Sequence, residues 1–158
     1  MKSLSFLARL VFLAIATYHY VHTGEFVFNA ALFIGTTVFL YLGTKDKRFY
    51  IVDAGFMLLF SIPEVLVIIG YPLVSDVIGV DKLFHLAAGA LIAYTSLLLW
   101  PRNKIVAVAF AFVVGLGWEW YEWSFGSVDS TQTITIIDTV TDLFSDVIGG
   151  ALLAFFSA

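Results

Sequence analysis

Six long apolar runs, separated by short polar breaks, occupy most of this sequence. A membrane-spanning helix needs about 20 mostly apolar residues, and runs of about that length recur along the chain. Hydrophobic residues make up 61% of the 158 residues, against about 45–50% in soluble domains. We therefore predict an all-α polytopic membrane protein, with residues 1–158 forming a single transmembrane domain, a bundle of six helices. The predicted spans are 4–22, 26–43, 49–70, 82–100, 105–123 and 138–157.

The positions of lysine and arginine predict how these helices are oriented. Cytoplasmic loops of membrane proteins carry an excess of both residues. If the N-terminus is cytoplasmic, seven basic residues lie inside and only Lys82 lies outside. We therefore expect both termini in the cytoplasm and a multi-pass protein of the inner, or cytoplasmic, membrane. The inner set is Lys2, Arg9, Lys45, Lys47, Arg48, Arg102 and Lys104.

With this orientation, five carboxyl groups and one histidine fall in the outer half of the last three spans, and a sixth carboxyl group, that of Asp146, lies deeper on the last span. On each helix these residues are three or four positions apart, so they share a helix face. Small residues on the same helices favour close packing, which brings the acids of the three helices together. The residues are Asp81, His85, Glu119, Glu122, Asp138, Asp142 and Asp146.

Three other residues fall at the same level on earlier spans, namely His19, His22 and Glu64. Asp53 is the one acid expected in the inner half of the membrane, where Arg48 or Arg102 could reach it.

Six carboxylates cannot all stay ionised and unpaired in a low-dielectric site. The outer half supplies one lysine and no arginine, so protons or bound cations must neutralise the rest. Oxygen ligands with one imidazole suit a divalent metal ion such as Mg²⁺, Mn²⁺, Zn²⁺ or Ca²⁺. The predicted metal ligands are His85, Glu119, Glu122, Asp138 and Asp142.

Asp81 and Asp146 are predicted to have catalytic roles beside these ligands. Asp81 would orient a ligand or become a further one, and Asp146 would orient a ligand or act as general base.

Most of these residues also have a purely structural interpretation. Asp81 and Asp138 could be helix N-caps, and Glu119 and Glu122 could reach the headgroups beside neighbouring tryptophans. Asp142 and Asp146 differ because they lie within a span. A charged side chain costs roughly 2.5–3.5 kcal/mol at the bilayer centre on insertion scales.

Three short segments in the second half carry a family resemblance. They are Asp81-Lys82-Leu83-Phe84-His85, then Glu119-Trp120-Tyr121-Glu122-Trp123, then Asp138-Thr139 with Asp142 and Ile148-Gly149. Together they resemble the YjdF-like family of bacterial inner-membrane proteins, which is similar in turn to the VanZ-like proteins. The resemblance covers about residues 80–155 and implies a multi-pass membrane protein without implying a reaction. The association of VanZ-like proteins with glycopeptide resistance implies a role near the outer envelope surface.

Three kinds of function remain open at this point. The first is a metal-dependent hydrolase or transferase that binds or acts on a lipid-linked or envelope substrate among the membrane lipids. The second is a small transporter or proton-coupled module. The third is an accessory structural subunit of a membrane-protein complex or homo-oligomer, whose acids pair with basic residues of a partner. A net charge of −4 argues against nucleic acid as a partner.

Overall fold

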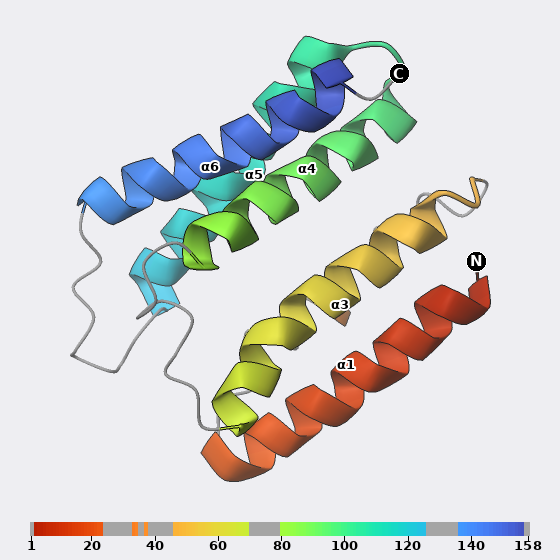
Figure 1. Cartoon of the computed structure of the whole chain (residues 1–158), viewed down its shortest axis with the longest axis vertical. Helices are drawn as coiled ribbons and strands as arrows, with labels where there is room; N and C mark the ends of the chain where they lie inside the picture. The colour runs from red at the N-terminus through yellow and green to blue at the C-terminus, as the bar shows by residue number, and fades with distance from the viewer. Residues whose placement is uncertain are drawn as a thin grey trace. The chain divides into compact units, whose positions relative to one another are not determined.

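The computed structural model describes residues 2–23, 33–34, 37, 46–69, 80–125 and 136–156. Within these ranges, the side chains of Thr23, Pro63, Glu64, Val67, Ile68, Val80, Glu122 and Phe125 are not described. The regular elements of this part are all α-helices (Figure 1). In chain order they are α1 (Lys2–Thr23), α3 (Phe49–Ile68), α4 (Val80–Leu99), α5 (Lys104–Phe125) and α6 (Ile136–Phe156).

The helices match five of the predicted spans to within two residues at each end. Four of them, α1, α4, α5 and α6, are long and apolar enough to cross a membrane, and α3 contains a shorter apolar stretch, Phe49–Ile62. The prediction of an all-α, membrane-compatible chain is therefore confirmed for the described residues. The predicted span at 26–43 lies almost entirely outside them, so the total of six spans remains a prediction.

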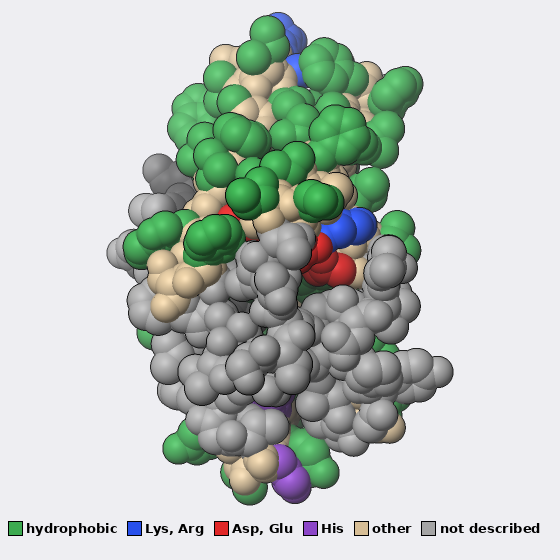
Figure 2. Space-filling view, turned by 90° about the vertical axis from the view of Figure 1, so that its left-hand side faces the viewer, with side chains coloured by type: hydrophobic (Ala, Val, Ile, Leu, Met, Phe, Trp, Pro, Cys, Tyr) green, Lys and Arg blue, Asp and Glu red, His purple; other side chains and the backbone are tan. Residues whose placement is uncertain are grey.

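The surface of the helices is that of a protein solvated by lipid. Large apolar side chains remain exposed on each of the described helices. Figure 2 shows a mostly hydrophobic described surface on the viewed face, with only small acidic and basic areas. In water, apolar patches of this extent would drive association, whereas lipid tails solvate them. Exposed apolar side chains of this kind include Phe6, Ile51, Ile105, Phe144 and Phe156.

Contacts divide the chain into two compact units, Met1–Val77 and Ile78–Ala158. In the first unit, α1 and α3 pack side by side and run in the same direction (Figure 1). Their polar link is Asp53, which is 2% exposed. Its carboxylate accepts hydrogen bonds from Ser5 Oγ at 2.5 Å and from Arg9 Nε at 2.9 Å. Arg9 Nη1 also donates to Thr37 Oγ1 at 2.6 Å.

The partner of Asp53 differs from the expected one. Arg9 forms the ion pair, because its position on α1 faces Asp53 across the helix contact. Arg48 instead binds Asp46 two residues away, with Nε 3.0 Å from Oδ2. The hydrogen bonds from Arg48 lower the pKa of the exposed Asp46 carboxyl group. Asp53 therefore takes its countercharge from Arg9 within the same unit, a partner that the expectation of Arg48 or Arg102 did not include.

The second unit consists of α4, α5 and α6, with α5 antiparallel to the other two (Figure 1). α4 ends before Pro101, because proline cannot continue a helix. After a short turn, Asn103 is the N-cap of α5, and its Oδ1 atom accepts a hydrogen bond from Val106 N at 3.2 Å. Near this end the three helices meet through one alanine each, Ala93, Ala107 and Ala154. The acidic residues lie towards the opposite end of the same unit.

Candidate metal centre

Glycines bring α4 and α6 into backbone contact beside the acidic residues. A Cβ atom on Gly89 would lie 2.7 Å from the carbonyl carbon of Asp146. Likewise, a Cβ on Gly149 would lie 2.8 Å from the carbonyl carbon of Leu86. Both distances are too short for a real side chain, so only glycine allows this approach. Since the two helices run in parallel, their first turns lie side by side.

A third glycine, Gly115 on α5, makes room for one of the acids. A Cβ atom there would overlap the Asp146 carboxylate and lie 3.2 Å from its Cγ. The side chain of Asp146 therefore occupies space that any larger residue on α5 would fill. Both Asp142 and Asp146 are only 2% exposed, so α6 buries two carboxylates among the three helices.

Lys82 binds three of the carboxylates. Its ammonium Nζ lies 3.0 Å from Asp81 Oδ2, 2.7 Å from Asp138 Oδ1 and 2.5 Å from Asp142 Oδ1. The lysine side chain is 28% exposed and that of Asp138 is 50% exposed, whereas Asp142 is buried. These carboxylates thus lead from the surface at the start of α6 into the helix bundle.

His85 lies one turn deeper on α4 and contacts carboxylates through both ring nitrogens. Nδ1 is 3.2 Å from Asp146 Oδ2, within hydrogen-bonding range. Nε2 is 3.8 Å from Asp81 Oδ1 and 3.7 Å from Asp142 Oδ1, too far for a hydrogen bond to either. With Nδ1–H donated to Asp146, the Nε2 lone pair is directed towards the other two carboxylates.

Asp81, His85 and Asp142 form a group that could hold a metal ion. One ligand atom from each lies within 4.8 Å of the others. Three such donors converge in three-ligand catalytic zinc sites. In metal sites, the histidine nitrogen that does not bind the ion commonly donates its N–H to a carboxylate. This contact holds the ring in place and makes the metal-binding nitrogen, here Nε2, more basic. Asp146 occupies that position.

Glu119 enters the same unit from α5. It is 4% exposed, and its Oε1 atom has no hydrogen-bond partner in the described part of the chain. It lies one turn beyond Gly115, and Thr139 on α6 is a hydrogen-bond partner of its carboxyl group. Trp123 Nε1 donates to the same threonine hydroxyl at 3.3 Å.

The structure thus brings together most of the residues singled out from the sequence. Asp81 and Asp138 are first-turn residues rather than N-caps, because α4 and α6 begin at Val80 and Ile136. Asp81, predicted as an orienting or additional group, belongs to the metal-compatible trio, and Asp138 binds Lys82. The side chains of Glu122 and Glu64 lie outside the described part.

The two histidines of α1 belong to the first unit. His19 is 9% exposed. His22 is exposed, its Nδ1 lies 2.7 Å from the Tyr18 carbonyl oxygen, and its ring stacks on that of Tyr18.

Sequence reasoning did not anticipate the role of Lys82. The sequence offers a single lysine at this level, and neither its charge nor its place beside Asp81 shows that it binds three carboxylates. The available signal was its spacing from His85, which places the two side chains on neighbouring positions of one helix end.

Comparison with known proteins adds no assignment: no protein-family model, curated protein or solved structure matches this chain. The chemistry of the site therefore rests on its own geometry. A carboxylate–imidazole–carboxylate group suits a divalent cation, and such an ion can polarise a phosphoryl or carbonyl oxygen and activate water.

Proposed function

We propose that this chain is a six-span membrane protein that binds a divalent metal ion through Asp81, His85 and Asp142 and acts on a lipid-linked, phosphate-bearing envelope substrate. One observation carries the proposal. Asp146 engages Nδ1 of His85 while Nε2 faces two carboxylates beyond hydrogen-bonding distance. Lys82 supplies part of the countercharge of Asp81 and Asp142. A divalent ion would give Nε2 and these two carboxylates, which do not hydrogen-bond one another, a common binding partner at low dielectric.

The charge balance supports the same conclusion. Five carboxyl groups, those of Asp81, Glu119, Asp138, Asp142 and Asp146, lie around the Lys82 ammonium and the His85 imidazole. Even a protonated histidine would leave three negative charges uncompensated if all five were ionised. With the neutral histidine that a metal ion requires, the excess is four, and a divalent ion removes two of these charges without protonating several acids.

The orientation of the helices in the membrane is part of this proposal. The distribution of basic residues supports cytoplasmic termini and a site near the outer face of the inner membrane. Resemblance of residues 80–155 to YjdF-like and VanZ-like proteins supports the same location. The exposure of Asp138 above the buried Asp142 supports access from the side where α4 and α6 begin.

The basic residues of the site determine how it could hold a phosphate. Its basic side chains among the described residues are Lys82 and His85, both engaged with carboxylates. A phosphate would therefore have to be held by the metal ion, as in metal-dependent phosphoryl chemistry. Asp146, on the far side of His85, would position the imidazole.

The test is the metal content of protein purified in mild detergent. We expect about one Mg²⁺, Mn²⁺, Zn²⁺ or Ca²⁺ per chain, since a preformed site of buried anionic ligands retains its ion. Asp142→Asn should abolish retention, while Asp46→Asn, which alters an exposed acid of the other unit, should leave it unchanged. The proposal would be overturned if the wild-type protein contained no metal and if neither chelator nor added metal changed its melting temperature.

A second candidate is proton-coupled transport. The observation in its favour is the continuous run of titratable contacts from Asp146 through His85 to Asp142 and Lys82. Beyond Asp146, however, the three helices close on Ala93, Ala107 and Ala154, and the buried polar side chains that follow Ala93 on α4 are the hydroxyls of Thr95 and Ser96 rather than carboxylates. This candidate predicts a proton flux in proteoliposomes that Asp146→Asn abolishes, and metal binding without such flux would exclude it.

A further inference from the structure

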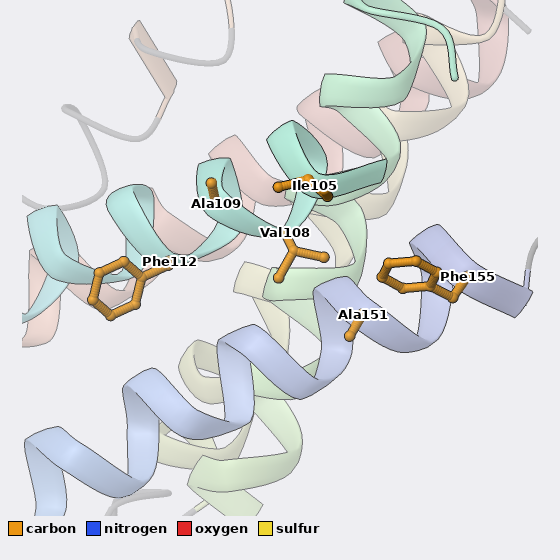
Figure 3. Close-up of a pocket in the computed structure, with 6 residues that line it drawn as sticks. All are labelled: Ile105, Val108, Ala109, Phe112, Ala151 and Phe155. Atoms are coloured by element: carbon orange, nitrogen blue, oxygen red, sulfur yellow. The ribbon is translucent and has the colours of Figure 1, made fainter. Parts of the chain in front are cut away.

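At the end of the second unit opposite the acids, α5 and α6 border a shallow, open apolar groove on the exposed helix surface. It measures about 390 Å³ and is lined by Ile105, Val108, Ala109 and Phe112 of α5 and by Ala151 and Phe155 of α6 (Figure 3). Alanines from both helices lie between the larger side chains that border it. Ile105 and Phe155 are mostly exposed, so the groove is open to the surrounding lipid.

One end of the groove carries positive charge. Lys104 Nζ lies over the Phe155 ring, 5.5 Å from its centroid. Arg102 is exposed in the turn that precedes α5. The sequence has no acidic residue between 83 and 118 or between 147 and 158, so neither basic group has an acidic neighbour along the chain.

The size of the groove argues for a single chain as occupant. On α5 it extends from Ile105 to Phe112, which is about 10 Å at 1.5 Å per residue. A partner helix that crossed the membrane would pack along about 30 Å. A free anion would gain nothing from the apolar lining, whereas a lipid has both an acyl chain and a charged headgroup.

We propose that this groove binds an anionic phospholipid, with one acyl chain against Ala109 and Ala151 and the headgroup phosphate beside Lys104 and Arg102. The site is separate from the proposed metal centre and does not depend on it. Basic residues next to a membrane surface each favour anionic lipid by a factor of about five.

The test is native mass spectrometry of the full chain released from detergent with equal amounts of dioleoyl phosphatidylglycerol and dioleoyl phosphatidylcholine. The two lipids share their chains and differ in net charge. We expect one retained phosphatidylglycerol, preferred by about five-fold or more. Lys104→Gln should reduce the preference, and Ala151→Leu should reduce retention of both lipids by filling the groove.

Gly117→Leu is the control, because it introduces the same leucine side chain on α5 at a position with open space around its Cβ. It should leave retention unchanged. Equal retention of the two lipids by the wild type, or retention that neither groove variant alters, would overturn the proposal. A lipid-free dimer that Ala151→Leu converts to monomer would also overturn it, because the occupant would then be a second copy of the chain.

Discussion

At the start of α4, Lys82 and His85 compete for the same carboxylates. The ammonium group binds Asp81 and Asp142, and both carboxylates also face Nε2 of the imidazole. Under the proposed metal binding, this lysine would be a tethered cation that stabilises the acids while no metal ion is bound. Its partial exposure allows the flexible side chain to move towards the surface and release the inner oxygens.

Replacing Lys82 tests this competition. Lys82→Met keeps an unbranched stem and removes the charge, so metal binding should tighten by about ten-fold, or 1.4 kcal/mol. Metal-free protein should lose about 1–3 kcal/mol of stability because three carboxylates lose their countercharge. Metal titration calorimetry and thermal unfolding with chelator measure the two effects. Lys47→Met, at an exposed position, is the control, and weaker metal binding by Lys82→Met would contradict the competition.

The space that Gly115 leaves for Asp146 can be tested by adding one carbon. Gly115→Ala should push the Asp146 carboxylate away from His85, which weakens metal binding about 10–100-fold. Overpacking should also cost about 1–3 kcal/mol. Gly117→Ala makes the same change on the same helix, where a Cβ meets nothing within 4 Å. Equal effects of the two substitutions on metal affinity would show that Asp146 does not orient the histidine.

At the scale of the helices, the decisive contact is the one between α4 and α6. Each helix contributes a glycine that meets the backbone of the other, so the pair is held at a fixed separation and register. Close approach of this kind drives helix association in membranes, where burial of apolar surface contributes little. α5 then completes the site by placing Gly115 and Glu119 against α6.

Gly89→Ala and Gly149→Ala should therefore separate the two helices rather than shift a side chain. In both cases the added Cβ meets rigid backbone, so we expect a loss of about 2–3 kcal/mol in unfolding experiments in detergent. Metal retention should fall as well, since Asp81 and His85 are on α4 and Asp142 is on α6. Stability equal to that of Gly117→Ala would mean that the helices are not in backbone contact.

At the scale of the whole molecule, charge separates the two ends of the second unit. Its acids lie where α4 and α6 begin, while Arg102 and Lys104 lie between the end of α4 and the start of α5. A chain that follows the positive-inside rule must expose these ends on opposite membrane faces. The proposed metal centre is then outside, and the proposed lipid groove is at the cytoplasmic leaflet.

The absence of cysteine from the sequence makes this orientation easy to measure. In intact cells, a membrane-impermeant maleimide should label Ile136→Cys at the exposed start of α6. It should label Asn103→Cys only after the membrane is permeabilised, because that turn lies in the cytoplasm in the proposed topology. The reverse pattern would place the acidic cluster inside and remove the envelope substrate from consideration.

The sequence by itself determined the helices and the faces on which their acids lie. Lengths of apolar runs placed five helices to within two residues, because a backbone in lipid must satisfy its hydrogen bonds within the same segment. The spacing of Asp138, Asp142 and Asp146 likewise placed them on one helix face.

Only the tertiary structure decided which side chains meet. The pairing of Asp53 with Arg9, the three carboxylates around Lys82 and the contact between Asp146 and His85 all depend on how neighbouring helices are rotated and aligned. Glycine–backbone contacts between α4 and α6 set that alignment in the second unit. They join positions about 60 residues apart, so the local periodicity that reveals a helix contains no information about them.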